Sequence, residues 1–364
     1  MTEQKQVGTD VDLTVDPDLE SMIDDVLAGF SGPDVEPDHT QVWETLREVG
    51  LARLTAPEEA GGSGAGWPEA AAVLRAAAAA GVAVPFAETD LLAGPLRRAA
   101  GIDDSSDSTA TVAVLAADGT ARAVPWAGST ATVVCVRRTA DGGFELADVE
   151  SDKLSIEPVE GISAVVAGDV TVSGDVKWHA VDASAVTGYV MRGALVRSLQ
   201  CVGAMEGMLD LAVAHTTERN QFGRALAKFQ SVQNLVVDIA AETVLARAAV
   251  DSALTDAVTN DLAGDLSGFR VAVARSVVSQ ALAVAVRNVH QVHGAIGTTH
   301  EHTLHRRTLP ALQWRGEYGS AALWESALTR LAIAGGMDGA WPLVVEGTNT
   351  DGVAALWLDA VAGR

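Results

Sequence analysis

Hydrophobic positions recur at helical spacing over most of the first hundred residues. Leu19, Met22 and Ile23 begin such a series just after Asp16 and Pro17, which suit the cap and the first turn of an amphipathic helix. The same spacing predicts further helices over 38–54, 68–81 and 88–101. We therefore expect an N-terminal helical domain over 17–105, preceded by a polar, flexible arm over 1–16.

Between residues 106 and 188 the pattern changes to short runs rich in valine and threonine, separated by turn residues. Asp118-Gly119 and Asp141-Gly142 are typical hairpin turn signals. This pattern predicts a small antiparallel β-barrel or sandwich in the middle of the chain. The strands are expected at 110–115, 131–138, 144–149, 164–172 and 185–190.

Helical periodicity returns at Met191 and continues almost to the end of the chain. It predicts four long helices, at about 191–218, 227–257, 263–293 and 318–335. In the second of them Val232, Ile239 and Thr243 share one face, as in a helix of a bundle. The expected fold is mainly α with a small β domain: a C-terminal four-helix bundle over 189–335 follows the β domain, and a C-terminal extension covers 336–364.

Composition excludes several classes of partner. The formal charge of −23 leaves no basic face for nucleic-acid phosphates, so we expect no nucleic-acid partner. The two cysteines, Cys135 and Cys201, are expected to be small buried hydrophobes rather than a disulfide. The N-terminus has no signal-peptide pattern and the uninterrupted apolar runs are too short for a bilayer, so we expect a cytoplasmic protein without a membrane partner.

Two short motifs stand out; the first gathers arginine, phenylalanine and glutamine, which are poor choices for the middle of a plain core helix. A guanidinium such as Arg219 can pair with phosphate oxygens, and Gly223 lets the backbone turn closely. The first motif, ERNQFGRALAKFQSVQN over 218–234, contains Arg219, Gln221, Phe222, Gly223, Phe229 and Gln230. The second, QVHGAIGTTHEHTLHRR over 291–307, contains Gln291, Gly294 and Gly297.

The order of domains and the two motifs together resemble the acyl-CoA dehydrogenases, whose signatures are R-x-Q-F-G…F-Q and Q-x-H-G-G-I-G…E. The resemblance covers nearly the whole chain. It implies FAD as cofactor, an acyl-CoA as substrate and a flavoprotein as electron acceptor. It also implies that the nine residues of the two motifs bind FAD, the first motif reaching the FAD of a neighbouring subunit and the second contacting the adenine–pyrophosphate end.

Histidines concentrated between 290 and 305 raise a metal site as an alternative. His302 and His305 are three residues apart, with His300 and Glu301 beside them. The run lies on a glycine-containing loop, however, and the sequence has neither HExxH nor a second ligand cluster. We therefore expect no metal, and we interpret His293 as a histidine at a helix end that hydrogen-bonds the backbone.

The catalytic base of the family is not found where the resemblance would place it. The family's α-proton abstraction needs a glutamate at one of two positions. Register from Gly294 leads to Tyr318, with Glu317 one residue away, and register from Arg219 leads back to Gly193. A literal Glu346-Gly347-Thr348 lies too far along the chain and is interpreted as coincidence.

The segment that should lie against the flavin ring also departs from the family. The family has a T-E-P…G-S-D loop there, whereas residues 112–130 read VAVLAADGTARAVPWAGST, in which only Gly128-Ser129 is similar. The flavin-ring side therefore looks reduced while the adenosine side looks intact.

Together these departures resemble the smaller, catalytically silent subunit of the heteromeric (α2β2) acyl-CoA dehydrogenases of bacterial steroid side-chain degradation. That resemblance implies a second acyl-CoA dehydrogenase subunit that brings the base and most of the flavin pocket. One alternative is a self-sufficient homo-oligomeric enzyme with Glu317 as its base. The other is a structural helical bundle that has lost FAD.

Overall fold

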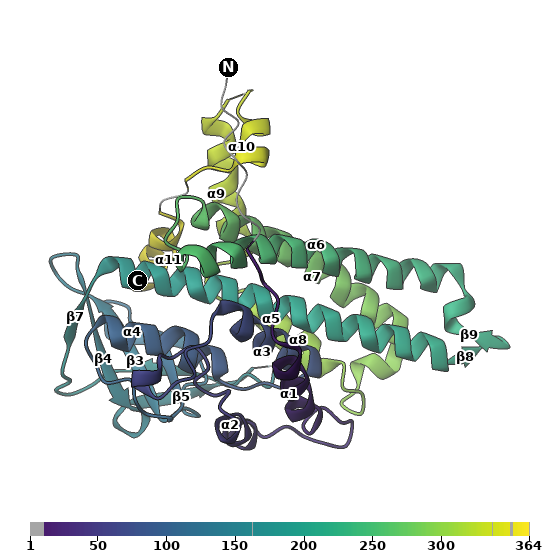
Figure 1. Ribbon diagram of the computed structural model, residues 1–364, viewed down its shortest axis with the longest axis horizontal. Helices are drawn as coiled ribbons and strands as arrows, with labels where there is room; N and C mark the ends of the chain where they lie inside the picture. Colours follow the sequence, from purple (N-terminus) through teal and green to yellow (C-terminus); the bar gives the residue numbers. More distant parts are fainter. Residues whose placement is uncertain (1–10, 162, 337, 350–351, 364) are drawn as a thin grey trace.

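A computed structural model describes residues 11–161, 163–336, 338–349 and 352–363 of the 364-residue chain. A long helical bundle carries the β domain at one end and a small hairpin, β8–β9, at the other (Figure 1). Helix α5 (Ala183–Glu218) runs between these two ends. Of the predicted arm, residues 1–10 lie outside the described residues, and Val15 is buried in the core.

The N-terminal helical domain has the predicted order of helices. Asp16 and Asp38 cap their helices by accepting hydrogen bonds from the backbone N–H of Asp18 and Thr40, at 2.8 and 2.9 Å. The segment predicted as a helix over 88–101 begins with a fully buried π-helical stretch. The elements are α1 (Pro17–Ala28), α2 (His39–Glu48), α3 (Trp67–Ala80), the π-helix η2 (Ala87–Ala93) and α4 (Gly94–Ala99).

The middle domain consists of two small sheets with strand orders β1-β3-β4-β7 and β2-β6-β5. The Asp141-Gly142 turn joins β3 to β4 as predicted, but β1 pairs with β3 in parallel, so the domain is not wholly antiparallel. The predicted strand over 185–190 is wrong, because those residues form the first turns of α5. The strands are β1 (Ala110–Val114), β2 (Thr120–Pro125), β3 (Thr132–Arg138), β4 (Phe144–Glu150), β5 (Ser155–Val159), β6 (Ala167–Thr171) and β7 (His179–Val181).

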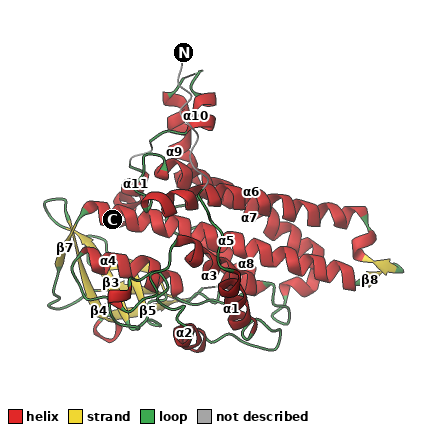
Figure 2. Ribbon diagram, viewed as in Figure 1, coloured by secondary structure: helices red, strands yellow, loops and turns green. Residues whose placement is uncertain are grey.

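The C-terminal part is helical, as Figure 2 shows, but it has more helices than the periodicity predicts. The bundle begins at Ala183, before the predicted boundary at 189. Helix α8 was not predicted, since Pro310 lies inside it. The remaining elements are α6 (Gln230–Asn260), α7 (Ser267–His293), the 3-10 helix η5 (Gly294–Thr298), α8 (His305–Trp314), α9 (Ala321–Ala334), α10 (Ala340–Glu346) and α11 (Val353–Ala362).

Helix α5 is the centre of the core, packed against α3, α6, α7 and α8. Gly203 and Gly207 let α3 approach closely, because a Cβ at either position would overlap the α3 backbone. Cys135 and Cys201 are buried and unpaired, which confirms the prediction. By length and composition, the segment Ser267–Thr298 is apolar enough to cross a membrane, which the sequence analysis did not expect. Half of its most apolar stretch is buried inside the protein, and α7 packs on α5, α6 and α9 as a core helix.

Candidate functional site

The first motif forms a hairpin at the free end of the bundle. Helix α5 ends at Glu218 with Arg219 as its cap, β8 (Asn220–Gln221) pairs with β9 (Arg224–Ala225), and Phe222 and Gly223 form the turn. Both turn residues have positive φ, +53° and +80°, which is the geometry of a type I′ turn. A phenylalanine rarely adopts this conformation, and here the Phe222 side chain is 91% exposed.

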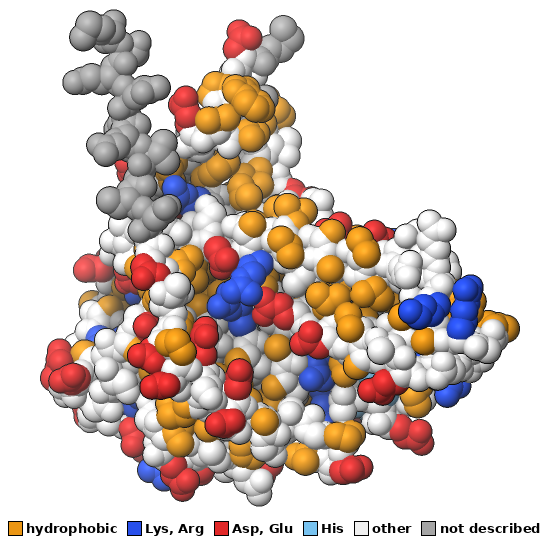
Figure 3. All heavy atoms as spheres, turned by 45° about the vertical axis from the view of Figure 1, so that its right-hand side comes forward, with side chains coloured by type: hydrophobic (Ala, Val, Ile, Leu, Met, Phe, Trp, Pro, Cys, Tyr) orange, Lys and Arg blue, Asp and Glu red, His pale blue; other side chains and the backbone are white. Residues whose placement is uncertain are grey.

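The hairpin gathers cations that have no ion pair among the described residues. Arg219, Arg224 and Lys228 all lie within it or directly after it. The Arg224 guanidinium lies 4.1 Å from the centre of the Phe229 ring. Basic side chains are visible at this end of the molecule in Figure 3. In a chain with a net charge of −23, such unpaired cations favour an anionic ligand.

The two motifs, far apart in sequence, meet in one pocket of about 660 Å³. Arg219 and Gln221 line it from the hairpin, and Gln291 and Gly294 line it from the end of α7. Its volume suits part of a cofactor. The other lining residues are His215, Glu218, Leu226, Val292, His293, Ala295, Ile296 and His302.

The remaining predicted FAD residues do not line this pocket. Phe222 and Gly223 form the hairpin turn, and Phe229 packs edge-on against Phe222, with ring centres 6.1 Å apart. Gln230 is exposed at the start of α6. Gly297 lies beneath the pocket, where a Cβ would stand 2.8 Å from the Cβ of His293.

Three histidines form one wall of the pocket, which the sequence analysis did not predict. The His215 and His293 rings stack with centres 4.6 Å apart, and His302 meets His293 at 4.7 Å. Burial lowers the pKa of all three, that of His293 to about 4. A signal for this cluster was available in the sequence, since His215 lies four residues before Arg219 and so faces the same side of the helix end.

The two positions considered for a base lie against each other near the other end of α5. The Tyr318 ring occupies the space that a Cβ at Gly193 would fill. Tyr318 is 8% exposed, and its hydroxyl lies 3.2 Å from that of Tyr189. Burial raises the pKa of both phenols well above the ordinary value, so both are protonated at neutral pH.

The backbone around Tyr318 is held by a buried arginine. Tyr318 has a φ of +54°, and the Trp324 indole N–H donates to its carbonyl at 3.2 Å. The Arg275 guanidinium donates to the carbonyls of Arg315, Glu317 and Gly319 at 2.7–3.0 Å. These bonds fix the loop between α8 and α9 and hence the position of the Tyr318 ring.

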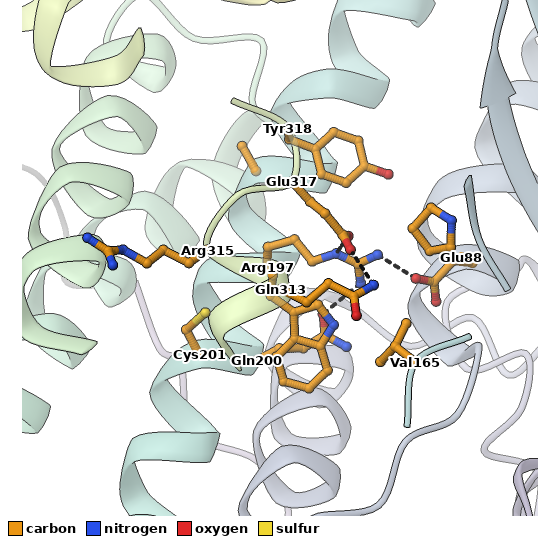
Figure 4. Close-up of polar contacts among 12 residues, drawn as sticks. Glu88, Val165, Arg197, Gln200, Cys201, Gln313, Arg315, Glu317 and Tyr318 are labelled. Atoms are coloured by element: carbon orange, nitrogen blue, oxygen red, sulfur yellow. Dashed lines mark hydrogen bonds and ion pairs between the residues drawn. The ribbon is translucent and has the colours of Figure 1, made fainter. Parts of the chain in front are cut away.

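Glu317, the candidate base from the sequence, points into a buried ionic cluster (Figure 4). The Arg197 guanidinium lies between the carboxylates of Glu317, at 2.6 Å, and Glu88, at 2.5 Å. Gln313 donates to the second Glu317 oxygen at 3.1 Å. Both oxygens of Glu317 are therefore hydrogen-bonded by this chain. Glu346 is exposed at the end of α10, on the projecting part of the molecule.

The C-terminal helix α11 covers the Tyr318 region. Trp357 stacks on the Tyr318 ring with centres 5.6 Å apart, and α11 packs on α5. Asp359 forms an ion pair with Arg138 of the β domain at 2.6 Å. The last helix of the extension predicted over 336–364 thus packs on the bundle, and the sequence analysis had given it no such contact.

Two buried tryptophans line a small cavity where the β domain meets the helices. Trp126 and Trp314 are 2% and 4% exposed, and this cavity of about 10 Å³ has room for about one water. Gly128 has a φ of +83° and lies in the turn between β2 and β3.

The alternative metal site has no support in the described part of the chain, where no group of three His, Cys, Asp or Glu side chains is placed to hold a metal. His305 instead hydrogen-bonds the His302 carbonyl through Nδ1 at 2.8 Å. His300 and His305 meet edge to face at 5.1 Å.

Comparison with known proteins agrees with this architecture. The model of the acyl-CoA dehydrogenase N-terminal domain matches residues 21–101, and that of the C-terminal domain matches residues 184–321. The chain is 29% identical to the acyl-CoA dehydrogenase IpdE2 of Mycolicibacterium smegmatis over 78% of this chain and 83% of that protein.

Solved structures share the fold. The ChsE4-ChsE5 complex from Mycobacterium tuberculosis superposes with a TM-score of 0.78 at 21% identity, covering 89% of this chain and 99% of that one. The Tcur3481-Tcur3483 steroid ACAD superposes with a TM-score of 0.74 at 23% identity, covering 87% and 97%. The two domain models span more than half of the chain in the expected order, and the protein therefore belongs to the acyl-CoA dehydrogenase family.

Proposed function

We propose that this chain is the catalytically silent subunit of a heteromeric acyl-CoA dehydrogenase and completes the FAD site of its partner. Bound FAD supplies the hydride acceptor of the reaction. This chain contributes Arg219 to the pyrophosphate and Gln291 and Gly294 to the adenosine side. The observation that carries the proposal is the contrast between an open pocket with an unpaired Arg219 and a base position filled by Tyr318.

The chemistry of the closed region, formed by Gly193, Glu317 and Tyr318, supports a base supplied by the partner. A protonated phenol cannot accept the α-proton of a thioester, and Gly193 has no side chain. Glu317 is hydrogen-bonded through both oxygens, to Arg197 and to Gln313. A general base needs its carboxylate aimed at the substrate, whereas this carboxylate is held by an arginine and a glutamine of the same chain.

The outer face of α6 supports a protein partner. Val237, Val244 and Leu245 are 55–68% exposed over about two turns of a helix that starts shortly after the hairpin. Apolar side chains grouped on one face mark an interaction surface. A second acyl-CoA dehydrogenase chain seated there would meet the hairpin and the pocket together, in an assembly of two copies of each chain.

The relatives support the substrate class. IpdE2 is an acyl-CoA dehydrogenase, and the Tcur3481-Tcur3483 structure is described as a steroid ACAD. The proposed reaction is the α,β-dehydrogenation of a steroid-derived acyl-CoA in the cytoplasm, with electrons leaving to an acceptor flavoprotein.

Co-expression with the neighbouring open reading frame tests the proposal. The purified complex should contain both chains in equal amounts and one FAD per pair of unlike chains, measured by native mass and flavin absorbance. The chain purified alone should be colourless and inactive toward acyl-CoA with an artificial electron acceptor. A yellow homo-oligomer whose turnover disappears in Glu317→Gln would establish the self-sufficient enzyme instead.

A further inference from the structure

The histidine wall of the pocket has a hydrogen-bonding pattern that the proposed function does not explain. His215 comes from α5, His293 from the end of α7, and His302 from the loop before α8. All three line the pocket that holds Arg219 and Gln291. A histidine whose role is to hydrogen-bond the backbone at a helix end does not require two other histidine rings in contact with it.

The hydrogen bonds fix the tautomer of His293. Its Nδ1 lies 2.8 Å from the Val289 carbonyl, and a carbonyl only accepts, so Nδ1 carries the proton. In the neutral ring Nε2 is then a bare acceptor. That atom is buried and has no hydrogen-bond partner among the described residues, while the whole residue is 5% exposed. A buried acceptor without a donor is unfavourable, so its position at a pocket points to a ligand.

His302 has the opposite pattern. Its Nδ1 accepts from the Leu304 backbone N–H at 3.1 Å, so its proton is on Nε2, which is a donor. Burial lowers the pKa of both rings, which keeps them neutral near pH 7. The pocket therefore offers one neutral acceptor beside one neutral donor, while the positive charge for phosphate lies on Arg219.

We propose that His293 and His302 recognise the amino edge of adenine, His293 Nε2 accepting from the exocyclic amino group and His302 Nε2–H donating to the adjacent ring nitrogen. Adenine presents such a donor beside N7, whereas a base with a carbonyl there presents two acceptors. His215 is a positioning residue that stacks on His293. The inference rests on the proposed FAD site and assigns its base-specific contacts.

Binding of nucleotides to the full chain, labelled with ¹⁵N at histidine, tests this assignment. ADP should shift the Nε2 resonances of His293 and His302. Inosine diphosphate carries the same phosphates but a carbonyl in place of the amino group, and it should bind about tenfold more weakly. FMN, which has no adenine, should leave both signals unchanged.

Single substitutions separate recognition from packing. His293→Phe keeps an aromatic ring and should weaken ADP binding about tenfold, removing the preference over inosine diphosphate. His302→Phe should do the same. The matched control His300→Phe alters an exposed ring outside the pocket and should change neither affinity. Thermal unfolding midpoints verify that each variant is folded.

A failure of this inference can be told apart from a failure of the proposed function. Three results would each overturn the inference. They are the absence of ADP binding at 10 mM, ADP binding without a change in the histidine signals, and a preference for ADP over inosine diphosphate that persists in His293→Phe. Lost affinity for 2′-deoxy-ADP rather than inosine diphosphate would assign the histidines to the ribose and overturn the adenine assignment. A partner complex without flavin would refute the proposed function, and the ADP titration would still decide the role of the histidines.

Discussion

Two aromatic residues adopt the same unusual backbone conformation in opposite surroundings. Phe222 and Tyr318 have φ values of +53° and +54°, yet their exposed fractions are 91% and 8%. Such conformations cost about 1–3 kcal/mol each. For Tyr318 the cost is offset by Arg275, Trp324 and the packing of Trp357. Among the described residues the only aromatic ring that contacts Phe222 is that of Phe229, so we expect a partner to supply the compensation.

The comparison extends along helix α5. Gly193 and Arg219 are about 40 Å apart at 1.5 Å per residue. At Gly193 the Tyr318 ring fills the space and Glu317 is hydrogen-bonded within the chain, whereas at Arg219 the side-chain charges have no ion pair among the described residues and line a pocket. This difference is what we expect of the proposed silent subunit, in which a ligand and a second chain complete the region around Arg219.

The largest expected effect comes from forcing a family-like acid into the closed region. Tyr318→Glu places a carboxylate beside Glu317 and Glu88, with one arginine, Arg197, already shared between them. An uncompensated buried charge costs about 3–5 kcal/mol. We expect that loss of stability in urea unfolding and no gain of turnover.

Tyr318→Phe is the matched control for this change. It removes only the hydroxyl bond to Tyr189, worth about 1 kcal/mol. Turnover by the Tyr318→Glu variant alone would show that this chain retains a working acyl pocket, and the contrast between the two regions would be lost.

In the open region, Arg219→Ala should affect cofactor binding but not folding. A charge-assisted hydrogen bond contributes about 1.5–3 kcal/mol, so FAD affinity of the partner complex should fall about 10- to 100-fold. The free energy of unfolding of the lone chain should stay within about 0.5 kcal/mol of the parent value, since the Arg219 side chain has no hydrogen bond or ion pair within the described chain. Arg330→Ala, an exposed arginine on α9, is the control and should change neither quantity.

The sequence predicted the mainly helical fold and singled out the two motifs that line one pocket, because helical spacing and short motifs are local. Register from the two motifs led to Gly193 and Tyr318 as positions for the catalytic base, but the sequence gave no sign that these two residues are in contact. The histidine wall and the return of Trp357 onto Tyr318 were not predicted, since each depends on contacts between distant segments. The strand over 185–190 was predicted wrongly because a short apolar run with Val186, Tyr189 and Val190 also fits one face of a buried helix.

A smaller effect tests the fit between Tyr318 and α5. Gly193→Ala inserts a methyl group where the Tyr318 ring lies and should cost about 1–3 kcal/mol by overpacking. In a double-mutant cycle with Tyr318→Ala the two changes should couple by about 0.5–3 kcal/mol, because the new methyl then fills part of the cavity. Gly188→Ala is the control: it lies on the same helix with nothing within 4 Å and should stabilise by up to about 1 kcal/mol. An additive cycle would show that the ring does not occupy this space.

The smallest effect concerns the acid sensitivity of the open region. Burial lowers the pKa of His293 from 6.5 to about 4. Between about pH 4 and pH 6.5 the ring is therefore protonated in the unfolded chain and neutral in the folded chain. The free energy of unfolding should therefore fall as the pH is lowered through 6.5, by less than about 1 kcal/mol between pH 7 and pH 6 from this group. Asp90, whose pKa burial raises to about 6, acts in the opposite direction. Comparing His293→Phe with the parent cancels the Asp90 contribution, and urea midpoints at the two pH values should show a shallower fall in the variant. Equal slopes in the two proteins would mean that His293 titrates alike when folded and unfolded, and its Nε2 would then be exposed to water rather than held for a ligand.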